Sequence, residues 1–372
     1  MKKISVLHIV LSTVTGGMEN VIYNLASNYD PSKLKLTIGC LVEVGFLSEK
    51  LREKGIESYL VPRMTPGVSM LYPRPLIKFI KDSGCDIVHT HSGCWMKVAA
   101  ACAYLPRVKL IYTEHGRAFP DKASRIFLDR LSINFTDKVV AVGDTLKDYM
   151  INTVKLPPRK VMTIFNGIDT GRFQPSMENR SSVREEFGYT DENVVIGIVA
   201  RLAEVKNHSF LIKTLKEIIA QCPEIRLLVI GDGPLRNELE QLTDGLGLPQ
   251  FVTFAGDRND VPRLLCGVDI STLCSVSEGI SLTILEAMAS SLPVVATNVG
   301  GNSTIIKNGE NGFLTEVGNI GDYGAKLTSL IKSPGMRAEI GNKARNHVID
   351  NWGVKGMADA YQKLYEELLG QN

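Results

Sequence analysis

The stretch VDISTLCSVSEGISLTILEAMASSLPVVATNVGG (residues 268–301) decides the fold class, because it joins two different structural patterns. VDISTLCS and LPVVAT are short apolar runs with many β-branched residues, as buried parallel strands are. Between them, SEGIS is a turn that contains Gly279, and LTILEAMASS is typical of a helix. A strand, a helix and a second strand in this order predict a βαβ unit with a parallel sheet.

The same alternation runs through the whole chain and divides it into two series. Six strand-like runs precede the polar passage 169–193, and six more follow it. We therefore predict an α/β protein with two Rossmann-like, doubly wound domains, residues 1–168 and 169–353. Ligands are expected in the cleft where the carboxyl ends of the strands face each other. The final segment, 354–372, is predicted to be a helix, and no strand follows it.

Composition excludes several classes of protein. The chain has 372 residues, 44% of them hydrophobic, and a net charge of +2, as a soluble two-domain protein has. No apolar run approaches the roughly 18 residues that a membrane helix needs. The start MKKISVLHIVLS resembles a signal peptide, but no cleavage site follows it, so we expect no export. The seven cysteines form no CxxC pair, which argues against disulfides or a zinc site and favours the cytoplasm.

Charge is unevenly distributed along the chain. The first 170 residues hold 23 Lys and Arg against 15 Asp and Glu, whereas the rest hold 19 against 25. The first half should therefore favour an anionic partner. In the segment 116–132, basic residues alternate with apolar ones: Arg117, Lys122, Arg125 and Arg130 with Phe119, Ile126, Phe127 and Leu131. A helix on an anionic membrane surface and a helix packed on the sheet both fit this pattern.

Two loops contain candidate groups for binding an anion. Gly16 and Gly17 lie between a predicted strand and a predicted helix, where bare backbone N–H groups can approach a phosphate. Arg201 directly follows a strand, and Lys206 lies at the start of the next helix, so the two cations could hold a diphosphate. An ordinary turn and a solvated loop remain the alternatives. A GxGxxG fingerprint is absent, which argues against an NAD enzyme.

Glu278 and Glu286 are the only charged side chains between residues 270 and 306. Ser281 is a predicted N-cap, so the backbone N–H groups of 279–283 would be free to bind a phosphate. A carboxylate accepts two O–H donors at once, which suits the adjacent hydroxyls of a sugar. The alternative is that both acids pair with basic residues from distant parts of the chain.

Five of the six histidines are weighed here as ligands. His89 and His91 lie at a strand end and are expected to point to opposite sides, so that one of them can contact an acceptor molecule. With no third ligand at a suitable spacing, we predict no metal site. His8 is expected to be a packed core residue, and His208 and His347 are expected to be structural.

The spacing Glu278-x7-Glu286 resembles the EX7E motif of retaining GT-B glycosyltransferases, in particular the GT4 group that builds bacterial polysaccharides and glycolipids. The likeness covers nearly the whole chain in the same order, through TGGMENVIYNLA, DIVHTHS, YTEHGR, FNGIDTGRFQP, VARLAEVKNHSFLI, LLVIGDGPLRNELE, VTFAGDRNDV and NWGVKGMADAYQKLYEEL. It implies a GT-B fold in which residues 1–168 bind the acceptor and 169–353 the nucleotide-sugar donor. The helix in 354–372 would cross back to the N-terminal domain.

The resemblance also implies roles for individual residues. Arg201 and Lys206 would neutralise the departing diphosphate. Glu286 would bind the ribose, whereas Glu278 and His115 would contact the transferred hexose. The further implied donor contacts are Gly16, Gly17, Gly231, Asp257, Gly279, Ile280, Ser281 and Leu282. His89 and His91 remain the candidate acceptor contacts because of their position at a strand end.

The implied activity is that of a retaining, metal-independent hexosyltransferase without a cofactor. It would move a hexose from a UDP- or GDP-sugar to a glycan or a polyprenyl-diphosphate-linked acceptor in capsule, exopolysaccharide, O-antigen or glycolipid synthesis. The leaving phosphate would accept the acceptor's proton. No DxD motif occurs, and no nucleic acid partner is expected. The enzyme would be cytoplasmic, at the inner membrane face if the helix in 116–132 docks there.

Two alternative functions remain open, and so does the identity of the donor sugar. A GT-B nucleotide-sugar epimerase or sugar-phosphate synthase would turn over without a lipid or glycan acceptor, and a silent binding protein would not turn over. Ser291 replaces the usual glycine of AMAxGxPVVA, and Ser303 and Thr304 replace a proline and an acid after VGG. These three departures put the donor sugar in doubt, while the principal contacts are retained.

Overall fold

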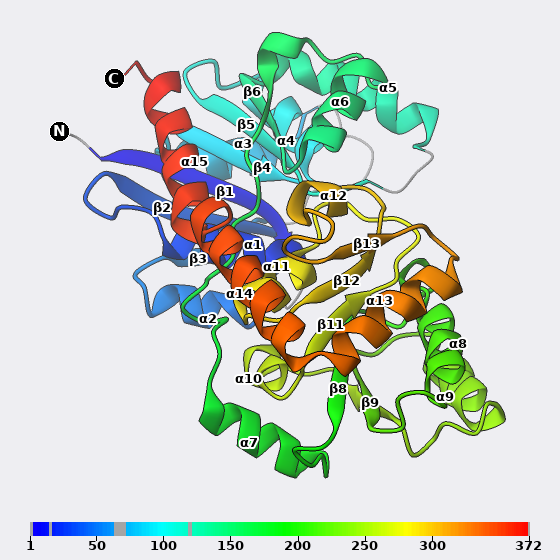
Figure 1. Ribbon diagram of the computed structural model, residues 1–372. Helices are drawn as coiled ribbons and strands as arrows, with labels where there is room; N and C mark the ends of the chain where they lie inside the picture. The colour runs from blue at the N-terminus through cyan, green and yellow to red at the C-terminus, as the bar shows by residue number, and fades with distance from the viewer. Residues whose placement is uncertain (1–2, 15–16, 63–71, 118–120, 371–372) are drawn as a thin grey trace. The chain divides into compact units, whose positions relative to one another are not determined.

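The computed structural model describes residues 3–14, 17–62, 72–117 and 121–370. The chain forms two compact units (Figure 1): unit 1 comprises residues 1–167 and 354–372, and unit 2 comprises residues 168–353. Each unit has one parallel sheet with helices against it. The two doubly wound α/β units predicted from the sequence are therefore present.

The sheet of unit 1 has seven parallel strands in the order β3-β2-β1-β4-β5-β6-β7. The strands are β1 (Ile4–Ser12), β2 (Leu34–Glu43), β3 (Glu57–Leu60), β4 (Ile87–His91), β5 (Lys109–Glu114), β6 (Lys138–Ala141) and β7 (Val161–Thr163). The helices are α1 (Gly17–Ser27), α2 (Leu47–Arg52), α3 (Arg74–Ser83), α4 (Trp95–Cys102), α5 (Ala123–Ser132), α6 (Asp144–Asn152), α15 (Val354–Leu368) and the short 3-10 helices η2 (Ile133–Phe135) and η3 (Pro158–Lys160). Strand β3 was not predicted; its residues are mostly exposed at the sheet edge.

The central strand β1 explains why this sheet is covered on both faces. Leu7 and Ile9 pack into a core with α3 and α4, whereas the adjacent Val10 packs into a second core with α1 and α2. Side chains alternate between the faces of a strand, so a nearly continuous apolar run such as SVLHIVL supplies both cores. The run thereby fixes β1 in the middle of the sheet.

The sheet of unit 2 has six parallel strands in the order β10-β9-β8-β11-β12-β13. The strands are β8 (Val194–Val199), β9 (Ile225–Ile230), β10 (Val252–Gly256), β11 (Ile270–Leu273), β12 (Val294–Thr297) and β13 (Phe313–Thr315). The helices are α7 (Met177–Glu186), α8 (His208–Ile218), α9 (Arg236–Gly245), α10 (Val261–Cys266), α11 (Leu282–Ala289), α12 (Asn302–Ile305), α13 (Ile320–Lys332), α14 (Pro334–Asn351) and the 3-10 helix η4 (Glu204–Lys206). The stretch 268–301 contains β11, α11 and β12, and its two strands pair in parallel, as predicted.

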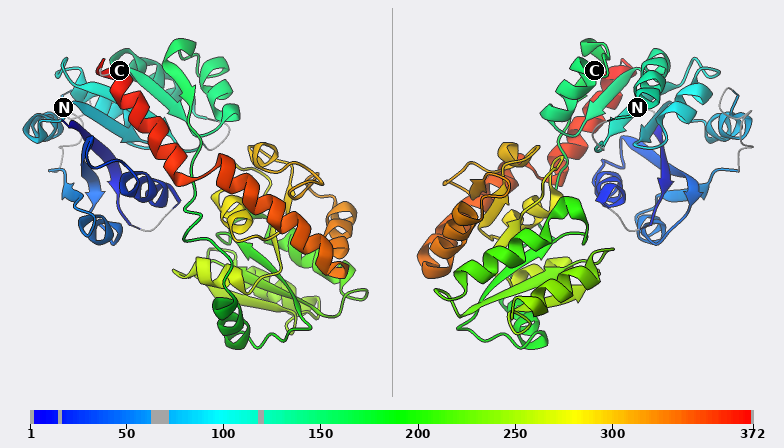
Figure 2. Two further views of the ribbon diagram at one scale, coloured as in Figure 1. Left: turned by 60° about the vertical axis from the view of Figure 1, so that its left-hand side comes forward. Right: turned by 90° about the vertical axis from the view of Figure 1, so that its right-hand side faces the viewer.

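The last two helices serve different units. Helix α14 packs against α11 of unit 2, whereas α15 packs against α1 of unit 1. Figure 2 shows the chain passing from α14 (orange) to α15 (red) through a short break. Tyr365 of α15 shares hydrogen bonds of 2.7 Å with both Tyr29 and His89. The end of the chain thus completes the fold of its first part.

Candidate functional site

A pocket of about 430 Å³ lies at the carboxyl ends of β8 and β9 in unit 2. In a doubly wound sheet, ligands bind beyond the carboxyl ends of the strands, where the strand order reverses direction. The order β9-β8-β11 places this reversal next to β8. Arg201, Gly231 and Asp257, three of the predicted donor contacts, line the pocket together with Thr283 of α11.

Glycines allow two loops to meet at the floor of this pocket. Gly231 has a φ of +132°, and a Cβ atom there would lie 2.2 Å from the carbonyl oxygen of Ala200. A Cβ at Gly233 would lie 2.5 Å from the carbonyl oxygen of Leu202. Because no side chain fits into either space, the GDGP loop packs directly on the backbone that carries Arg201.

Arg201 presents a free cation at the pocket. It follows β8 directly, is exposed, and makes no ion pair or hydrogen bond through its side chain with another residue of the described ranges. A guanidinium offers five N–H donors in a planar fork, which matches the oxygens of a phosphate. Arg201 is therefore available to an anionic ligand.

Lys206 is held in place by Glu278. The Lys206 Nζ donates to Glu278 Oε1 at 2.5 Å, and the Ser275 hydroxyl donates to the same oxygen at 2.5 Å. The side chains of Lys206 and Glu278 are 24% and 10% exposed, so the ion pair is partly shielded from water. The alternative that an acid of this stretch pairs with a basic residue from a distant part of the chain therefore holds for Glu278. The partner was missed because it follows a different strand of the sheet.

The turn before α11 has the structure that the N-cap prediction requires. The Ser281 hydroxyl accepts a hydrogen bond from the backbone N–H of Ile284 at 3.5 Å. Gly301 donates its N–H to the carbonyl of Gly279 at 2.8 Å, and a Cβ at Gly300 would collide with the carbonyl of Glu278. Gly300 and Gly301 therefore pack directly against the backbone of the turn at Glu278 and Gly279. The turn and the first residue of α11 together contain four predicted contacts: Gly279, Ile280, the N-cap Ser281 and Leu282.

Glu286 lies in the second turn of α11 and keeps its carboxyl group unpaired. Loss of contact with water raises the pKa of Glu286 from 4.5 to about 7, against the opposing effect of the Arg172 guanidinium. No hydrogen bond or ion pair joins its carboxyl group to another residue that the structure describes. Glu286 is half-buried, and its carboxyl has no partner among the described residues, so this carboxyl gains if a ligand supplies O–H donors.

Unit 1 contains a compact cluster of histidines. His8, His89 and His91 are fully buried, and nitrogen atoms of the three rings lie within 4.8 Å of one another. The rings of His89 and His91 are 4.3 Å apart between centroids. The expectation that these two point to opposite sides is wrong, because residues two apart on a strand share one face.

The hydrogen bonds of the cluster use most of its ring nitrogens. His89 contacts Tyr365 Oη and Thr113 Oγ1, each at 2.7 Å. His91 contacts His8 Nδ1 at 3.1 Å and His115 Nε2 at 2.9 Å. Neither His89 nor His91 therefore has a free ring nitrogen for the acceptor contact expected from their position at a strand end. His8 is the nearby third histidine that sequence spacing did not reveal, yet the cluster is a hydrogen-bonded network rather than a free set of metal ligands.

His115 ends this network at the carboxyl end of β5. Its backbone N–H donates to the Ser92 hydroxyl at 2.8 Å, which fixes the main chain. Burial lowers the pKa of His115 to about 4, so the imidazole is neutral at physiological pH. Its Nδ1 is buried and has no partner among the described residues. Of the two predicted glycines in this unit, Gly17 begins α1, whereas Gly16 lies outside the described residues.

Arg117, before α5, and Arg125, within it, are engaged in ion pairs inside unit 1. The Arg117 side chain is fully buried and pairs with Glu114 at 2.8 Å, with Asp121 at 2.6 Å and with Asp129 at 2.5 Å. Arg125 also pairs with Glu114, at 2.9 Å. Phe119 lies outside the described residues. The charge pattern therefore reflects a buried ion network, and the packed-helix interpretation explains Arg117 better than a membrane contact does.

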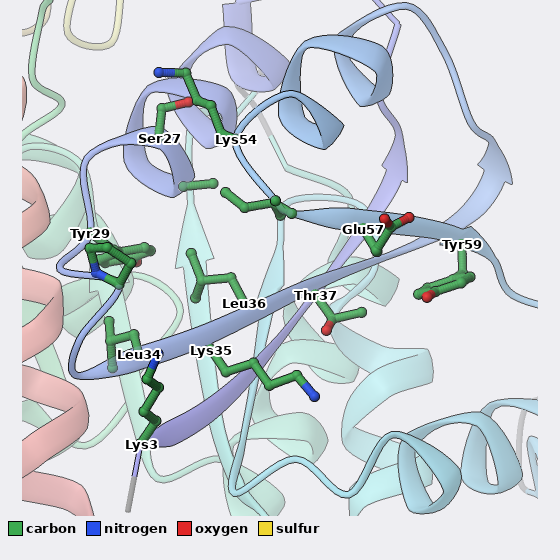
Figure 3. A pocket seen from close by; sticks show the side chains of 14 residues that line it. Lys3, Ser27, Tyr29, Leu34, Lys35, Leu36, Thr37, Lys54, Glu57 and Tyr59 are labelled. Carbon is green, nitrogen blue, oxygen red and sulfur yellow. The ribbon is translucent and has the colours of Figure 1, made fainter.

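A second pocket, of about 560 Å³, lies in unit 1 beside the start of β2. Figure 3 shows Lys3, Lys35 and Lys54 around it, together with Tyr29 and Tyr59. None of the predicted site residues lines this pocket. Within the described ranges, no helix combines the length and apolarity needed to span a bilayer.

Two contributors to the site in unit 2 were missed by sequence reasoning. Ser275 donates to Glu278, and its own carbonyl accepts from the Thr297 hydroxyl at 2.5 Å. Arg172 acts on Glu286 through its charge. Ser275 lies three residues before Glu278 and two residues after the end of β11, so its position after a strand was the available signal. Arg172 comes from the polar joint between the two strand series and carried no such signal.

Comparisons with known proteins identify the family of both halves of the chain. Residues 15–172 match the family described as Glycosyltransferase Family 4, and residues 179–347 match the family described as Glycosyl transferases group 1. An Escherichia coli relative, UDP-Gal:alpha-D-GlcNAc-diphosphoundecaprenol alpha-1,3-galactosyltransferase, is 27% identical over 99% of this chain and 98% of its own. The N-acetyl-alpha-D-glucosaminyl L-malate synthase of Bacillus anthracis is 25% identical over 91% of this chain and 98% of its own.

Solved structures show the same fold. A glycosyltransferase from Rickettsia africae matches with a TM-score of 0.88 at 22% identity, over the whole of both chains. The HepE protein of Anabaena, solved with UDP, matches with a TM-score of 0.84 at 23% identity, over 98% of this chain and 100% of its own.

Proposed function

The chain belongs to the GT4-type glycosyltransferases of GT-B fold, and we propose that it transfers a hexose from a UDP-sugar to a polyprenyl-diphosphate-linked acceptor with retention of configuration. The name of the Escherichia coli relative describes both a UDP-sugar donor and a diphosphoundecaprenol acceptor. That relative aligns over almost the full length of both chains, which supports carrying over the class of donor and acceptor.

The unpaired Arg201 at the pocket of unit 2 is the observation that carries this proposal. A UDP-sugar brings a diphosphate whose negative charge grows when the bond to the sugar breaks. Arg201 and the tethered Lys206 supply two positive charges near the carboxyl end of β8. Preorganised charges of this kind stabilise a transition state without having to rearrange. These two protein cations do the work for which other transferases use a metal ion, so we propose a metal-independent reaction.

The two carboxylates have separate roles in this proposal. Glu286 accepts hydroxyl groups of the ribose, because its unpaired carboxyl lacks any other donor among the described residues. Glu278 uses Oε1 for Lys206 and Ser275, which leaves Oε2 for a hydroxyl of the transferred sugar. Glu278 therefore links the position of the sugar to the position of the cation that faces the diphosphate.

The proposed reaction needs no protein base. The bond between the anomeric carbon and the UDP oxygen breaks, and a bond to the acceptor oxygen forms on the same face of the sugar. The acceptor's proton passes to a β-phosphate oxygen of the departing UDP. The protein residues bind, orient and neutralise charge, and the lipid anchor of the acceptor places the reaction at the cytoplasmic face of a membrane.

A mass-spectrometric assay tests the proposal directly. The purified full chain is incubated with each of UDP-galactose, UDP-glucose, UDP-N-acetylglucosamine, GDP-mannose and ADP-glucose, with and without a short polyprenyl-diphosphate-linked N-acetylglucosamine. We expect UDP and an extended acceptor from at least one UDP-sugar, also when EDTA is present. Consumption of the donor without an acceptor, giving an epimer or a free sugar, would favour the epimerase alternative instead. NMR of the product determines whether the anomeric configuration is retained.

A further inference from the structure

Helix α5 and the short helix η2 that follows it lie at the surface of unit 1 (Figure 1) and present three large apolar side chains to solvent. Phe127, Leu131 and Phe135 are 60%, 48% and 50% exposed. Residues four apart lie on the same side of a helix, so Phe127 and Leu131 share one face, and Phe135 follows at the same spacing. Single exposed apolar residues are common, whereas a row of three indicates a contact surface. We call these three residues the apolar stripe.

The fold of unit 1 holds α5 and η2 without the apolar stripe. Ile126 and Ile133 of the same two helices pack into the core that unit 1 forms with α3 and α4. Asp129 of α5 pairs with the buried Arg117 at 2.5 Å. The helices are therefore anchored by other residues, and the stripe is left for a contact with another molecule.

The exposed charges near the apolar stripe all have a positive sign. Asp129, the one acid of α5 and η2, has a side chain only 11% exposed, and Asp121, just before α5, has one only 3% exposed. Helix α4 packs against α5 and η2 and contains a single charged residue, a lysine. The exposed or half-exposed charged side chains of α4, of α5 and of the residue before α5 are Lys97, Lys122, Arg125 and Arg130. The ion network that buries the acids thus leaves a cationic surface.

This combination favours an anionic lipid bilayer over a second copy of the chain. Two copies that met symmetrically through the apolar stripe would use the same surface on both partners and would bring like charges together. An anionic bilayer instead offers phosphates to the cations and acyl chains to the stripe. The acceptor of the proposed function is itself anchored in a bilayer by a polyprenyl chain.

We propose that the apolar stripe inserts into the surface of an anionic membrane, while Lys97, Lys122 and Arg130 contact the lipid phosphates. Helix α5 then lies along the membrane surface, with the rest of unit 1 packed on its inner side. Arg117 takes no part in this contact, because its side chain is fully buried. The proposal rests on the proposed function, which supplies the lipid-linked acceptor, but the binding itself needs no substrate.

Co-sedimentation with vesicles tests the docking directly. The full chain is mixed with vesicles of phosphatidylcholine alone, or of phosphatidylcholine with about one third phosphatidylglycerol, which gives them a negative surface potential. We expect binding to the anionic vesicles, and binding weaker by at least about tenfold to the neutral ones. The double substitution Phe127→Ser with Leu131→Ser should weaken binding to the anionic vesicles by about tenfold or more. Lys122→Glu should weaken it by about fivefold or more.

A second exposed apolar pair supplies the matched control. Tyr59 and Leu60 of β3 are 49% and 54% exposed, so Tyr59→Ser with Leu60→Ser removes a similar apolar surface from the same unit. This variant should bind the anionic vesicles as the native protein does. Equal binding to the two kinds of vesicle, or an equal loss in the two double variants, would overturn the proposal. So would a native dimer, seen by sedimentation equilibrium, that dissociates in the Phe127→Ser and Leu131→Ser variant, because the stripe would then belong to a second copy.

Fluorescence tests whether the stripe enters the bilayer. The two native tryptophans, Trp95 and Trp352, are only 4% and 5% exposed, so Phe127→Trp adds an exposed one. Lipids brominated on their acyl chains should quench the added fluorescence when this variant binds anionic vesicles. Tyr59→Trp should show no such quenching. A vesicle-bound Phe127→Trp protein without added quenching would contradict insertion.

Activity separates this inference from the proposed function. With the acceptor embedded in anionic vesicles, we expect Phe127→Ser with Leu131→Ser to lower kcat/KM by about tenfold, whereas with a water-soluble, short-chain acceptor the change should stay within about twofold. If neither form of the acceptor is used by the native chain, the proposed function fails while the vesicle binding still stands. If the native chain transfers a sugar but binds no anionic vesicles, this inference alone fails.

Discussion

Lys206 and Glu278 are 72 residues apart in the sequence, and their charged atoms lie 2.5 Å apart in the structure. The two residues follow β8 and β11, which are neighbours in the sheet of unit 2 at the point where the strand order reverses. The ion pair therefore joins two loops that each have a candidate role in binding the donor. A long lysine side chain loses conformational entropy when it becomes ordered. Here the ion pair with Glu278 orders Lys206 before a ligand binds, so binding does not have to offset that loss.

Substitution of Lys206 by Met should reduce turnover far more than it reduces stability. The variant keeps the aliphatic stem and loses the charge that faces the departing diphosphate. We expect kcat to fall by about 10²-fold, comparable to the loss of one preorganised donor. Lys213→Met is the matched control, because Lys213 is an exposed lysine on the following helix α8. Equal kcat values for the two variants would show that Lys206 has no part in the reaction.

Substitution of Arg201 by Ala should lower the rate through lost charge stabilisation. The expected loss is about 2 to 4 kcal/mol in the activation free energy, which corresponds to roughly 30- to 1,000-fold in kcat. Arg201→Lys keeps a charge and loses the planar fork, so it should recover only part of the rate. Single-turnover kinetics with saturating UDP-sugar measures both values. Full activity in Arg201→Ala would remove this residue from the site.

Substitution of Glu286 by Gln should weaken binding of the nucleotide. An amide offers one oxygen acceptor where an ionised carboxylate offers two, so we expect the Kd for UDP to rise by about tenfold. Calorimetry with UDP and with 2′-deoxy-UDP identifies the contact. If Glu286 binds the ribose, the substitution should affect UDP strongly and the deoxy compound little. An equal effect on both ligands would place the carboxylate elsewhere.

The raised pKa of Glu286 predicts a specific dependence of stability on pH. In the folded protein this carboxyl keeps its proton up to about pH 7, whereas its ordinary pKa is 4.5. Its protonated form therefore contributes stability below pH 4.5, and the contribution is lost as the pH rises from 4.5 to about 7. Glu286→Gln does not titrate. Urea unfolding without nucleotide measures the free energy of unfolding of both proteins. Relative to the native protein, the variant should become more stable as the pH rises above about 7, and it should show no such gain near pH 4.5. A difference in free energy that does not change with pH would contradict the raised pKa.

Substitution of Arg117 by Ala should destabilise unit 1. The change leaves the buried Asp129 without its cation and leaves Glu114 with Arg125 alone, and breaking such a buried pair typically costs about 3 to 5 kcal/mol. Lys122→Ala, at an exposed position before α5, should change the free energy of unfolding by less than about 0.5 kcal/mol. Urea unfolding measures both. Similar values for the two variants would mean that the ion network contributes little to the fold.

Sequence reasoning predicted the helices and strands of this protein better than the side-chain contacts between distant loops. The βαβ unit of 268–301 and the N-cap at Ser281 follow from local pattern. Arg201 and Gly231, which line one pocket, were both expected as donor contacts from the family resemblance. Periodicity is a property of neighbouring residues, so a single sequence reveals it.

Side-chain pairs between distant loops could not be anticipated in the same way. The ion pair of Lys206 with Glu278 and the contact of His8 with His91 depend on strand order, and the alternation of apolar runs does not give that order. The expected orientation of His89 and His91 was wrong for a simpler reason. Residues two apart on a strand lie on the same face of the sheet, whereas the expectation placed them on opposite faces. The pattern around Arg117 left two interpretations open, because charge alone does not tell a buried ion from a surface one.

The position of α15 has a consequence for how the protein is made. Unit 2 is a continuous segment of chain, whereas unit 1 needs Tyr365, near the end of the chain, to satisfy Tyr29 and His89. A nascent polypeptide leaving the ribosome therefore holds an unfinished first unit throughout the synthesis of the second. We infer that unit 2 can mature first, and that a stop codon before α15 would damage the part of the protein that was translated earliest.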